Sequence, residues 1–554
     1  MTQSHFDALI VGAGFSGIYQ LHKLLSQGFS VKGIDAAGDV GGTWYWNRYP
    51  GAMSDTESYL YRYSWDKEDL VKYHWKDHYV KQTEVLAYLN HIVERYDLRK
   101  HMQFSTELEH AQYDEVRNVW VVECSNGQIY TTRYLITALG LLSKTNYPRI
   151  AGIETFLGEM YHTGKWPGTH DFANKRVGII GNGSTGVQVM TAIAKQVKHL
   201  TSFQRTPQYS VPSGDGPVSK EYRDSINARW DEIWGQVRDS NVAFGFEESK
   251  IPTMSVSAEE RERIFEEAWQ KGNGFRFMFW TFNDVTTDEA ANEEACKFIR
   301  KKIGETVKDP EKARKLQPDD FYARRPLCDA GYYEQFNRDN VDIVSLRETP
   351  IEAITETGIT LSNGTKYDLD VLIFATGFDA VDGNYTRLAI KGRDGVSLRD
   401  HWAENGGPTT YLGSFVPGFP NLFMLTGPNS PFTNLPPTIE TQVEFISDLI
   451  FRAEVSPKGS TASARVNGEA TNGATKPSPP GPVIEALPES EQKWTQECKD
   501  LCENSLFKKT SSWIFGANIP GKTQTVMFYF GGLAAYRKVL KEVVDGGFVG
   551  FRDF

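Results

Sequence analysis

DALIVGAGFSG, residues 7–17, is a short apolar segment that leads into three glycines in the spacing GxGxxG. The apolar residues predict a buried strand, and the glycines predict a tight turn into a helix whose positive end faces a pyrophosphate. The next apolar run, residues 30–34, ends at Asp35. An acidic residue at this place hydrogen-bonds a free ribose 2′-hydroxyl. The stretch therefore predicts a strand–turn–helix unit that binds a dinucleotide.

A second stretch of the same kind, VGIIGNGSTG at residues 177–186, differs in the charge that follows it. The apolar run 199–203 leads to Arg205, and an arginine at this place suits a ribose 2′-phosphate. Its polar neighbours Gln204 and Thr206 favour a phosphate site over a solvated surface arginine. The two units predict an α/β protein with two Rossmann-like domains, one for a resident dinucleotide and one for a visiting, phosphorylated dinucleotide.

The composition is that of a globular protein of several domains. The chain has 554 residues, whereas one domain usually has about 100–200. The formal net charge of −11 argues against nucleic acid and against an anionic membrane surface as partners. Because the sequence shows neither an apolar run long enough for a membrane span nor a signal peptide, we expect a cytoplasmic protein. We also expect a monomer or a weak oligomer.

The five cysteines are scattered along the chain and predict reduced thiols. Two of them, Cys498 and Cys502, share a helix face by spacing, but two sulfurs without further ligands make a poor metal site. We therefore expect no metal. The absence of a CxxC pair after the first glycine turn argues against a dithiol reductase.

Both nucleotide domains are predicted to be interrupted along the chain. The apolar stretches 134–140 and 370–377 each end in glycine, as expected where the chain crosses between two domains. Between these crossings lies a charged helical insertion, in which SAEE at 257–260 predicts a helix over 258–269 and TTDE at 286–289 predicts a helix through Ile303. A stretch rich in Gly, Ser and Pro predicts a flexible surface loop over about 455–485. The expected segments are 1–142 and 383–554 for the first nucleotide domain, 143–210 and 333–382 for the second, and 211–332 for the insertion.

Four further blocks of sequence resemble one family. FLGEMYHTGKWP, residues 156–167, fits the string FxGxxxHxxxWP that is typical of type I Baeyer–Villiger monooxygenases. GGTWYWNRYPGAMSD at 41–55, RRPLCD at 324–329 and SWIFGANIPG at 512–521 are similar to blocks of the cyclohexanone monooxygenases. The resemblance covers nearly the whole chain except the stretch 455–485.

The resemblance implies the chemistry of that family. NADPH reduces FAD, O2 adds to the flavin, and the resulting peroxide attacks a small-molecule ketone, which rearranges to an ester or lactone. A deprotonated peroxide needs a cation that cannot lose its proton, and arginine meets this need better than lysine. The motif match implies Arg325 as this catalytic cation and Asp55 as the carboxylate that orients it. His162 is expected to be structural.

The resemblance also implies where the cofactors and the substrate bind. FAD is expected at the first glycine turn and the block after it, namely Gly12, Gly14, Ser16, Gly17, Asp35, Thr43, Trp44, Tyr45, Trp46, Asp55, Tyr61 and Leu435. NADPH is expected at the second turn and the later blocks, namely Met53, Ser54, Asn182, Gly183, Ser184, Thr185, Gly186, Gln188, Arg205, Thr206, Arg324, Arg325 and Trp513. Phe432 and Leu435 are expected to line the substrate pocket, although packing in the core explains them equally well.

Two other functions stay open at the level of sequence. An N- or S-oxygenating flavin monooxygenase shares both nucleotide folds, but Trp166, Pro167 and Arg325 argue against it, with sulfoxidation kept as a side activity. An NADPH-binding redox sensor or oxidase without an organic substrate is the second alternative. The joint presence of Asp55, Arg325 and Trp513 argues against it.

Overall fold

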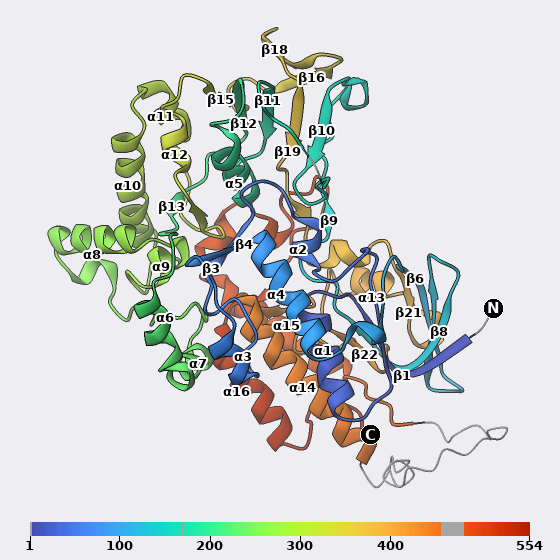
Figure 1. Cartoon of the computed structure of the whole chain (residues 1–554). Helices are drawn as coiled ribbons and strands as arrows, with labels where there is room; N and C mark the ends of the chain where they lie inside the picture. Colours follow the sequence, from blue (N-terminus) through green and yellow to red (C-terminus); the bar gives the residue numbers. More distant parts are fainter. Residues whose placement is uncertain (1–2, 169, 456–480, 554) are drawn as a thin grey trace.

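The first glycine turn follows strand β1 (Gln3–Val11), which lies inside an eight-stranded sheet. β1 pairs in parallel with β2 (Val31–Ile34) on one side and with β8 (Ile129–Thr137) on the other. The turn leads into α1 (Phe15–Ser26), which packs against α14 (Leu435–Val455) from the C-terminal part of the chain. This strand–turn–helix unit is as predicted. The computed structural model describes residues 3–168, 170–455 and 481–553 (Figure 1).

Segments that are far apart in the sequence complete this sheet. The meander of β6 (Leu108–Asp114) and β7 (Val119–Cys124) continues it in antiparallel fashion beyond β8. β21 (Ala389–Lys391) pairs in parallel with β6, and β22 (Leu422–Met424) pairs in parallel with β8. β5 (Met102–Gln103) forms the opposite edge beside β2. The sheet therefore needs residues from both ends of the chain.

The second glycine turn follows a strand of a separate, wholly parallel sheet, drawn above the first in Figure 1. Its five strands are, in spatial order, β10 (Glu159–His162), β19 (Val371–Phe374), β11 (Arg176–Ile180), β12 (His199–Gln204) and β15 (Val341–Ser345). β11 leads into α5 (Ser184–Ile193). The fold thus has two Rossmann-like units, and each is assembled from two separated segments, although the exact domain boundaries stay a prediction.

The two turns share one steric requirement. Gly12 has φ +117°, and a Cβ there would lie 2.3 Å from the carbonyl oxygen of Ala138. Gly181 has φ +106°, and a Cβ there would lie 2.4 Å from the carbonyl oxygen of Ala375. Only glycine fits a positive φ with the backbone at the end of the neighbouring strand, β8 or β19, so close. The spacing of the motif therefore lets each helix begin directly at the end of its strand.

A helical insertion covers one side of the second sheet, at the left of Figure 1. Its helices are α6 (Lys220–Asn227), α7 (Trp230–Asp239), α8 (Ala258–Lys271), α9 (Gly274–Phe279), α10 (Glu289–Thr306) and α11 (Pro310–Leu316). Phe265, Phe298 and Ile299 of the insertion belong to the same buried cluster as Val177 and Leu200 of the sheet. The insertion and the second sheet therefore share one hydrophobic core.

Of the two predicted helix starts in the insertion, one is confirmed and one is wrong. Ser257 is the N-cap of α8, and its Oγ accepts a hydrogen bond from the Glu260 amide at 3.3 Å. α10 begins instead after Asp288, whose carboxylate accepts from the Ala291 amide at 2.8 Å. Thr286 does not cap it, because the amide of Asp288 still donates to the Asp284 carbonyl in the preceding turn.

The remaining helices and strands are grouped by the sheet on whose side they lie. On the side of the first sheet they are α2 (Thr43–Trp46), β3 (Met53–Glu57), α3 (Lys67–Lys72), β4 (Tyr79–Lys81), α4 (Gln82–Arg95), α13 (Leu398–Glu404), β23 (Ser430–Pro431), α15 (Pro488–Glu503), β24 (Phe528–Tyr529) and α16 (Gly532–Asp545). On the side of the second sheet they are β13 (Ser210–Pro212), β14 (Leu327–Asp329), α12 (Tyr332–Gln335), β16 (Ile351–Thr355), β17 (Gly358–Leu361) and β18 (Lys366–Asp368).

The predicted flexible loop 455–485 lies mostly outside the described residues. Val455 is the last residue of α14. At the other end Ile484 is buried, and its amide donates to the Asn421 side chain at 2.7 Å. The next residues continue this packing, since Ala486 forms a β-bridge with Phe551. The last residues of the predicted loop are therefore packed against the core.

The two crossings of the chain between the sheets lie side by side. β9 (Lys144–Thr145) on the first crossing pairs antiparallel with β20 (Phe378–Asp379) on the return. Beside them His162 is buried, and its Nδ1 accepts a hydrogen bond from the Gly164 amide at 3.0 Å. Burial lowers the pKa of His162 to about 4. The imidazole is therefore neutral near pH 7.

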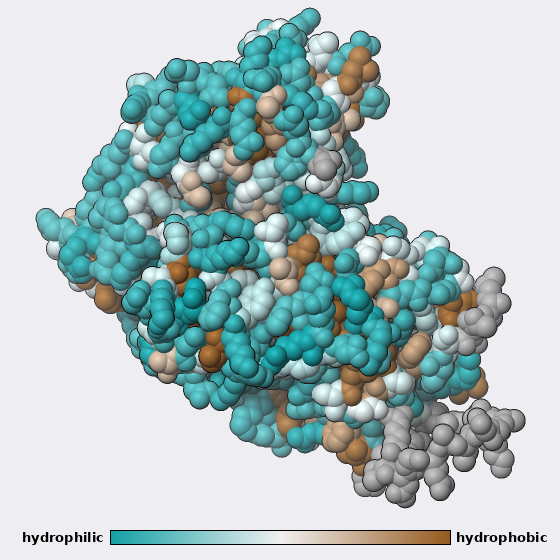
Figure 2. Space-filling model, in the orientation of Figure 1, coloured by the Kyte–Doolittle hydropathy of each residue, from teal (hydrophilic) through white to brown (hydrophobic). Residues whose placement is uncertain are grey.

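The visible face of the molecule is mainly hydrophilic, with hydrophobic residues in small separate groups, and is notched between the upper and lower lobes (Figure 2). Within the described ranges, none of the helices combines the length and apolarity needed to cross a membrane.

We expect the neutral His162 to make stability depend on mildly acidic pH. The folded pKa of about 4 lies below the unfolded value of 6.5, so unfolding takes up a proton as the pH falls from 6.5 toward 4. The free energy of unfolding should fall by up to about 1.4 kcal/mol per pH unit in this window. His162→Asn, whose Oδ1 can still accept from Gly164, should lack this loss in urea titrations at pH 5.0 to 7.5. A stability difference between the two proteins that does not vary with pH would contradict the prediction.

Candidate active site

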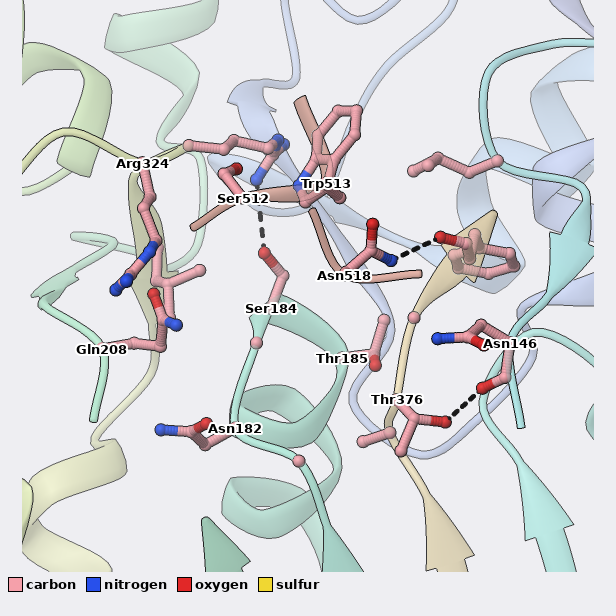
Figure 3. A pocket seen from close by; sticks show the side chains of 18 of the residues that line it. Asn146, Asn182, Ser184, Thr185, Gln208, Arg324, Thr376, Ser512, Trp513 and Asn518 are labelled. Atoms are coloured by element: carbon pink, nitrogen blue, oxygen red, sulfur yellow. Dashed lines mark hydrogen bonds between the residues drawn. The ribbon is translucent and has the colours of Figure 1, made fainter. Parts of the chain in front are cut away.

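A cavity of about 1220 Å³ lies where the α5 turn, the helical insertion and the loop after α15 meet (Figure 3). Both polar and aromatic side chains line it, and they come from segments that are hundreds of residues apart. Most of the residues predicted for cofactors and chemistry contribute to this lining. They are Thr43, Trp44, Met53, Ser54, Asp55, Tyr61, Asn182, Gly183, Ser184, Thr185, Gln188, Arg205, Thr206, Arg324, Arg325, Phe432, Leu435 and Trp513.

Arg325 and Asp55 form an ion pair in this cavity. Asp55 lies on β3, and Arg325 lies just before β14. Arg325 Nη1 is 2.6 Å from Asp55 Oδ2, and the Asp55 side chain is 6 % exposed whereas that of Arg325 is 31 % exposed. Burial acts to lower the pKa of Arg325, but the Asp55 carboxylate outweighs it and holds this pKa above its ordinary value. The pair therefore presents a permanent cation to the cavity, with its counter-charge behind it.

Further contacts fix the orientation of the guanidinium. Arg325 Nη1 donates to Ser184 Oγ at 3.3 Å, the dashed contact above Ser184 in Figure 3. The guanidinium carbon lies 5.2 Å from the ring centroid of Phe275, within the range of a cation–π interaction. Phe275 in turn stacks on Phe244 with centroids 4.0 Å apart. Arg325 is thus held by a carboxylate, a hydroxyl and an aromatic face.

The second glycine turn faces the cavity with uncapped amides. α5 has Gly183 as its N-cap, with no side-chain hydrogen bond to the first amides. Asn182 Nδ2 instead donates to Gln204 Oε1 at 3.1 Å and to the Thr206 carbonyl at 2.9 Å. Gln188 is buried and accepts from Tyr49 Oη at 2.7 Å. The free amides suit a pyrophosphate, whereas the side chains of Asn182 and Gln188 are already bonded to protein.

The two arginines predicted for the 2′-phosphate, Arg205 and Arg324, both line the cavity. Arg205 is exposed, and Thr206 and Gln208 lie next to it in the lining. Arg324 already forms an ion pair with Asp320, and its Nε donates to the Ser511 carbonyl at 3.1 Å. Arg205 is therefore the more accessible of the two for a 2′-phosphate.

Trp513 lines the cavity from the loop that follows α15. Ser512 caps this short turn by accepting from the Ile514 amide, and the Trp513 ring packs edge-on against Phe528 at 5.9 Å. Farther along, Asn518 Nδ2 donates to the Phe378 carbonyl at 2.8 Å (Figure 3). The loop is thus tied to the return crossing of the chain.

The first glycine turn lies apart from this lining. Asp35 is buried and accepts from the amides of Ala13 at 2.6 Å and Ala37 at 2.7 Å. Burial raises the pKa of Asp35, while these two hydrogen bonds oppose the rise. Asp35 therefore shapes the turn itself, and each of its oxygens keeps a lone pair for a ribose hydroxyl. The other predicted residues outside the lining are Gly12, Gly14, Ser16, Gly17, Tyr45, Trp46 and Gly186.

The turn at the first sheet nevertheless has the features that a dinucleotide needs. Gly14 is the N-cap of α1 without a side-chain hydrogen bond, so the first amides of this helix are uncapped by side chains. A Cβ on Gly14 would lie 3.3 Å from the Cα of Gly42, which leaves the two backbones in close approach. Nearby, Trp44 Nε1 donates to Tyr61 Oη at 3.1 Å. The uncapped amides of α1 suit a pyrophosphate, and Trp44 and Tyr61 suit contact with an aromatic ring system.

A largely aromatic wall of the cavity was not predicted from the sequence. It consists of Val242, Phe244, Phe275 and Phe279 from the insertion together with the predicted Phe432 and Leu435. The phenylalanine-rich stretches 242–246 and 275–279 were the available signal, but such spacing is equally typical of core packing. Phe432 also packs edge-on against Phe528, with centroids 5.4 Å apart.

Comparison with known proteins shows similarity over the full length. Residues 9–267 match the family model described as pyridine nucleotide-disulphide oxidoreductase. A Baeyer–Villiger monooxygenase from Pseudooceanicola batsensis is 50% identical over 98% of this chain and 95% of its own. A phenazine N-monooxygenase from Lysobacter antibioticus is 48% identical over 99% of this chain and 97% of its own. The structure of cyclohexanone monooxygenase from Rhodococcus sp. Phi1 bound to NADP+ is 53% identical, with a TM-score of 0.94 over 100% of this chain and 99% of that one.

We expect Arg205→Ala to weaken binding of NADPH about ten-fold or more, with little effect on NADH, because only NADPH carries the 2′-phosphate that pairs with a cation. Dissociation constants from fluorescence titration measure both. Arg347→Ala is the matched control, since Arg347 is a half-exposed arginine that pairs with Asp319 outside the lining. Equal losses for NADPH and NADH would remove Arg205 from the phosphate site.

Proposed function

The chain belongs to the Baeyer–Villiger monooxygenases, and from this premise we propose that it converts ketones to esters or lactones with NADPH and O2. Its cofactors are FAD and NADP(H). The observation that carries the proposal is the Arg325–Asp55 pair, which presents a fixed cation to an aromatic cavity beside the second glycine turn.

We assign the two cofactors to the two glycine turns. The α1 turn with Asp35, together with Trp44 and Tyr61, would hold FAD, and the α5 turn with Arg205 would hold NADP(H). When bound, FAD supplies electron transfer from NADPH and the activation of O2. The protein groups bind and orient both cofactors and shield the reaction from water.

Arg325 provides the charge that the substrate step requires. Nucleophilic attack on a ketone moves negative charge onto the carbonyl oxygen, and a fixed donor stabilises this charge more than it stabilises the neutral ketone. Asp55 keeps the guanidinium oriented, because Asp55 Oδ2 lies 2.6 Å from Arg325 Nη1. Arginine retains its proton throughout, so it acts as an electrostatic stabiliser and not as a general acid.

The aromatic wall supports a ketone with an apolar carbon skeleton. Phe244, Phe275 and Phe279 lie with Phe432 and Leu435 in the lining of the same cavity as Arg325. Such a wall binds alicyclic or aliphatic carbon by burial of apolar surface and leaves the carbonyl to the polar side. We propose Phe432 and Leu435 as substrate contacts on this basis.

Oxygenation of an aromatic ring nitrogen is a second candidate function. The phenazine N-monooxygenase is nearly as similar to this chain as the Baeyer–Villiger relative. The stacked pair Phe244 and Phe275 suits a flat aromatic substrate, because aromatic rings prefer offset-stacked or edge contacts with such faces. One cavity can therefore serve either substrate class.

We expect the purified, FAD-loaded protein to consume NADPH in the presence of cyclic or linear ketones and to form the corresponding ester or lactone. A panel of ketones of graded size, with sulfides and a phenazine as parallel substrates, and identification of products by mass spectrometry tests this. Oxidation confined to the heteroaromatic nitrogen or to sulfides, with all ketones unreacted, would contradict the main proposal and favour the second candidate.

Arg325→Ala should still allow NADPH to reduce FAD but should lower ester formation by about 100-fold or more, since the cation acts on charge that develops in the substrate step. Arg325→Lys should retain part of the activity, because it keeps the charge and loses the planar geometry. Stopped-flow reduction and product analysis separate the two half-reactions. Unchanged ester formation by the alanine variant would exclude Arg325 from the chemistry.

A further inference from the structure

Asn273 lies where β3, which carries Asp55, meets α9, which carries Phe275. It immediately precedes α9 and is 3 % exposed. Its backbone has φ +78°, in the region that favours glycine. The Asn273 amide donates to the Pro212 carbonyl of β13 at 2.7 Å. Strand β13 pairs in turn with β14, the strand that follows Arg325.

The side-chain amide of Asn273 uses both of its ends. Its Oδ1 accepts from the amides of Phe275 at 2.9 Å and Arg276 at 3.2 Å, and so caps α9. Its Nδ2 donates to the backbone carbonyl of Asp55 at 2.9 Å and to Tyr79 Oη at 3.1 Å. The cap faces the helix of Phe275, and the two donors face the strand pair that carries Asp55. One side chain therefore connects both supports of the Arg325 guanidinium.

The backbone on either side of Asn273 has no room for a side chain. A Cβ on Gly272 would lie 2.6 Å from the Gly214 amide nitrogen, and a Cβ on Gly274 would lie 2.7 Å from the Leu327 carbonyl oxygen. The junction is thus packed directly against the residues that follow Arg325. A second link reinforces it, because Arg276 Nη2 is 2.7 Å from Glu57 Oε1 at the end of β3.

Helix capping alone does not require asparagine in this conformation. Ser257 caps α8 in the same insertion with an extended backbone at φ −66°. A glycine at position 273 would adopt φ +78° without strain. What asparagine adds over serine or aspartate is the pair of Nδ2 donors that reach Asp55 and Tyr79.

We propose that Asn273 is a positioning residue for oxygen transfer, which fixes the Asp55 strand relative to α9 and thereby sets the place of Arg325. The inference rests on the proposed roles of Asp55 and Arg325. Loss of the Nδ2 donors would let β3 and α9 shift against each other. The cation would then lie off the position where charge develops, and NADPH would be oxidised by O2, which is reduced to hydrogen peroxide, without ester being formed.

The test compares two variants that separate capping from the link to Asp55. Asn273→Asp keeps an oxygen that caps α9 but replaces the donor that faces the Asp55 carbonyl. Asn273→Gly accepts the backbone conformation and removes both functions. Ser257→Gly is the matched control, because it removes an N-cap of the same insertion without contact to Asp55. All are measured as FAD-loaded enzymes at a temperature where thermal unfolding shows each to be folded.

The main readout is the ratio of ester formed to NADPH consumed, and the second is the dissociation constant of NADP+. Both Asn273 variants should lower the coupling ratio about five-fold, because both lose the buried hydrogen bond to the Asp55 carbonyl and one such bond is worth about this factor. Both should also weaken the binding of NADP+ by a similar factor, because Arg325 is displaced. Ser257→Gly should retain the ratio of the unaltered protein.

Two results overturn the inference. If Asn273→Asp retains the coupling ratio while Asn273→Gly loses it, capping alone explains the residue. If both retain it, Asn273 does not position the pair at all. Ester formation by the unaltered protein in the same assay keeps these outcomes distinct from failure of the proposed function, since its absence contradicts the proposed chemistry and the inference together.

Discussion

The structure of the cavity depends on the burial of one carboxylate. Asp55 is 6 % exposed, and its Oδ1 has no hydrogen-bond partner among the described residues. Only Oδ2 is paired, with Arg325. Removing the partner of such a buried charge costs roughly 3–5 kcal/mol, so β3 and the segment before β14 must stay together. Because β3 follows the first glycine unit and Arg325 lies near the end of the insertion, this contact joins two parts of the chain, beside the links of Asn273 to Asp55 and of Arg276 to Glu57.

The interleaved order of the chain brings that contact close to the second glycine turn, because Arg325 Nη1 lies 3.3 Å from Ser184 Oγ at the start of α5. In a parallel sheet the loops at the carboxyl ends of the strands form the binding crevice, and both glycine turns lie at such ends. The buried hydrogen bond between Tyr49 and Gln188 connects the segment before β3 with α5. Arg325 also contacts Ser184 at the start of α5. The guanidinium of Arg325 is therefore in direct contact with the helix that follows the second glycine turn.

Local patterns predicted the parts of the fold that are set by local sterics. The glycine spacing predicted both turns, because the carbonyls of Ala138 and Ala375 leave no room for a Cβ at Gly12 and Gly181. Ser257 predicted the start of α8. Thr286 failed as a cap because the preceding turn through Asp284 delays the helix. The wall of Phe244 and Phe275 could not be separated from core, since its exposure to a cavity depends on packing with distant segments. The contacts of Asn273 were invisible for the same reason.

The two candidate substrate classes place different demands on the site. A flat aromatic nitrogen substrate needs the stacked wall, which the Phe244–Phe275 pair provides by itself. Attack on a ketone in addition produces an alkoxide-like oxygen, and stabilising it requires a cation held in a fixed place. A buried carboxylate with only one of its two oxygens paired carries a desolvation cost that opposes folding, and packing alone does not explain why Arg325 is held in this way. Its presence is explained when the charge that Arg325 must meet develops only during the reaction, which is the condition that ketone oxygenation imposes.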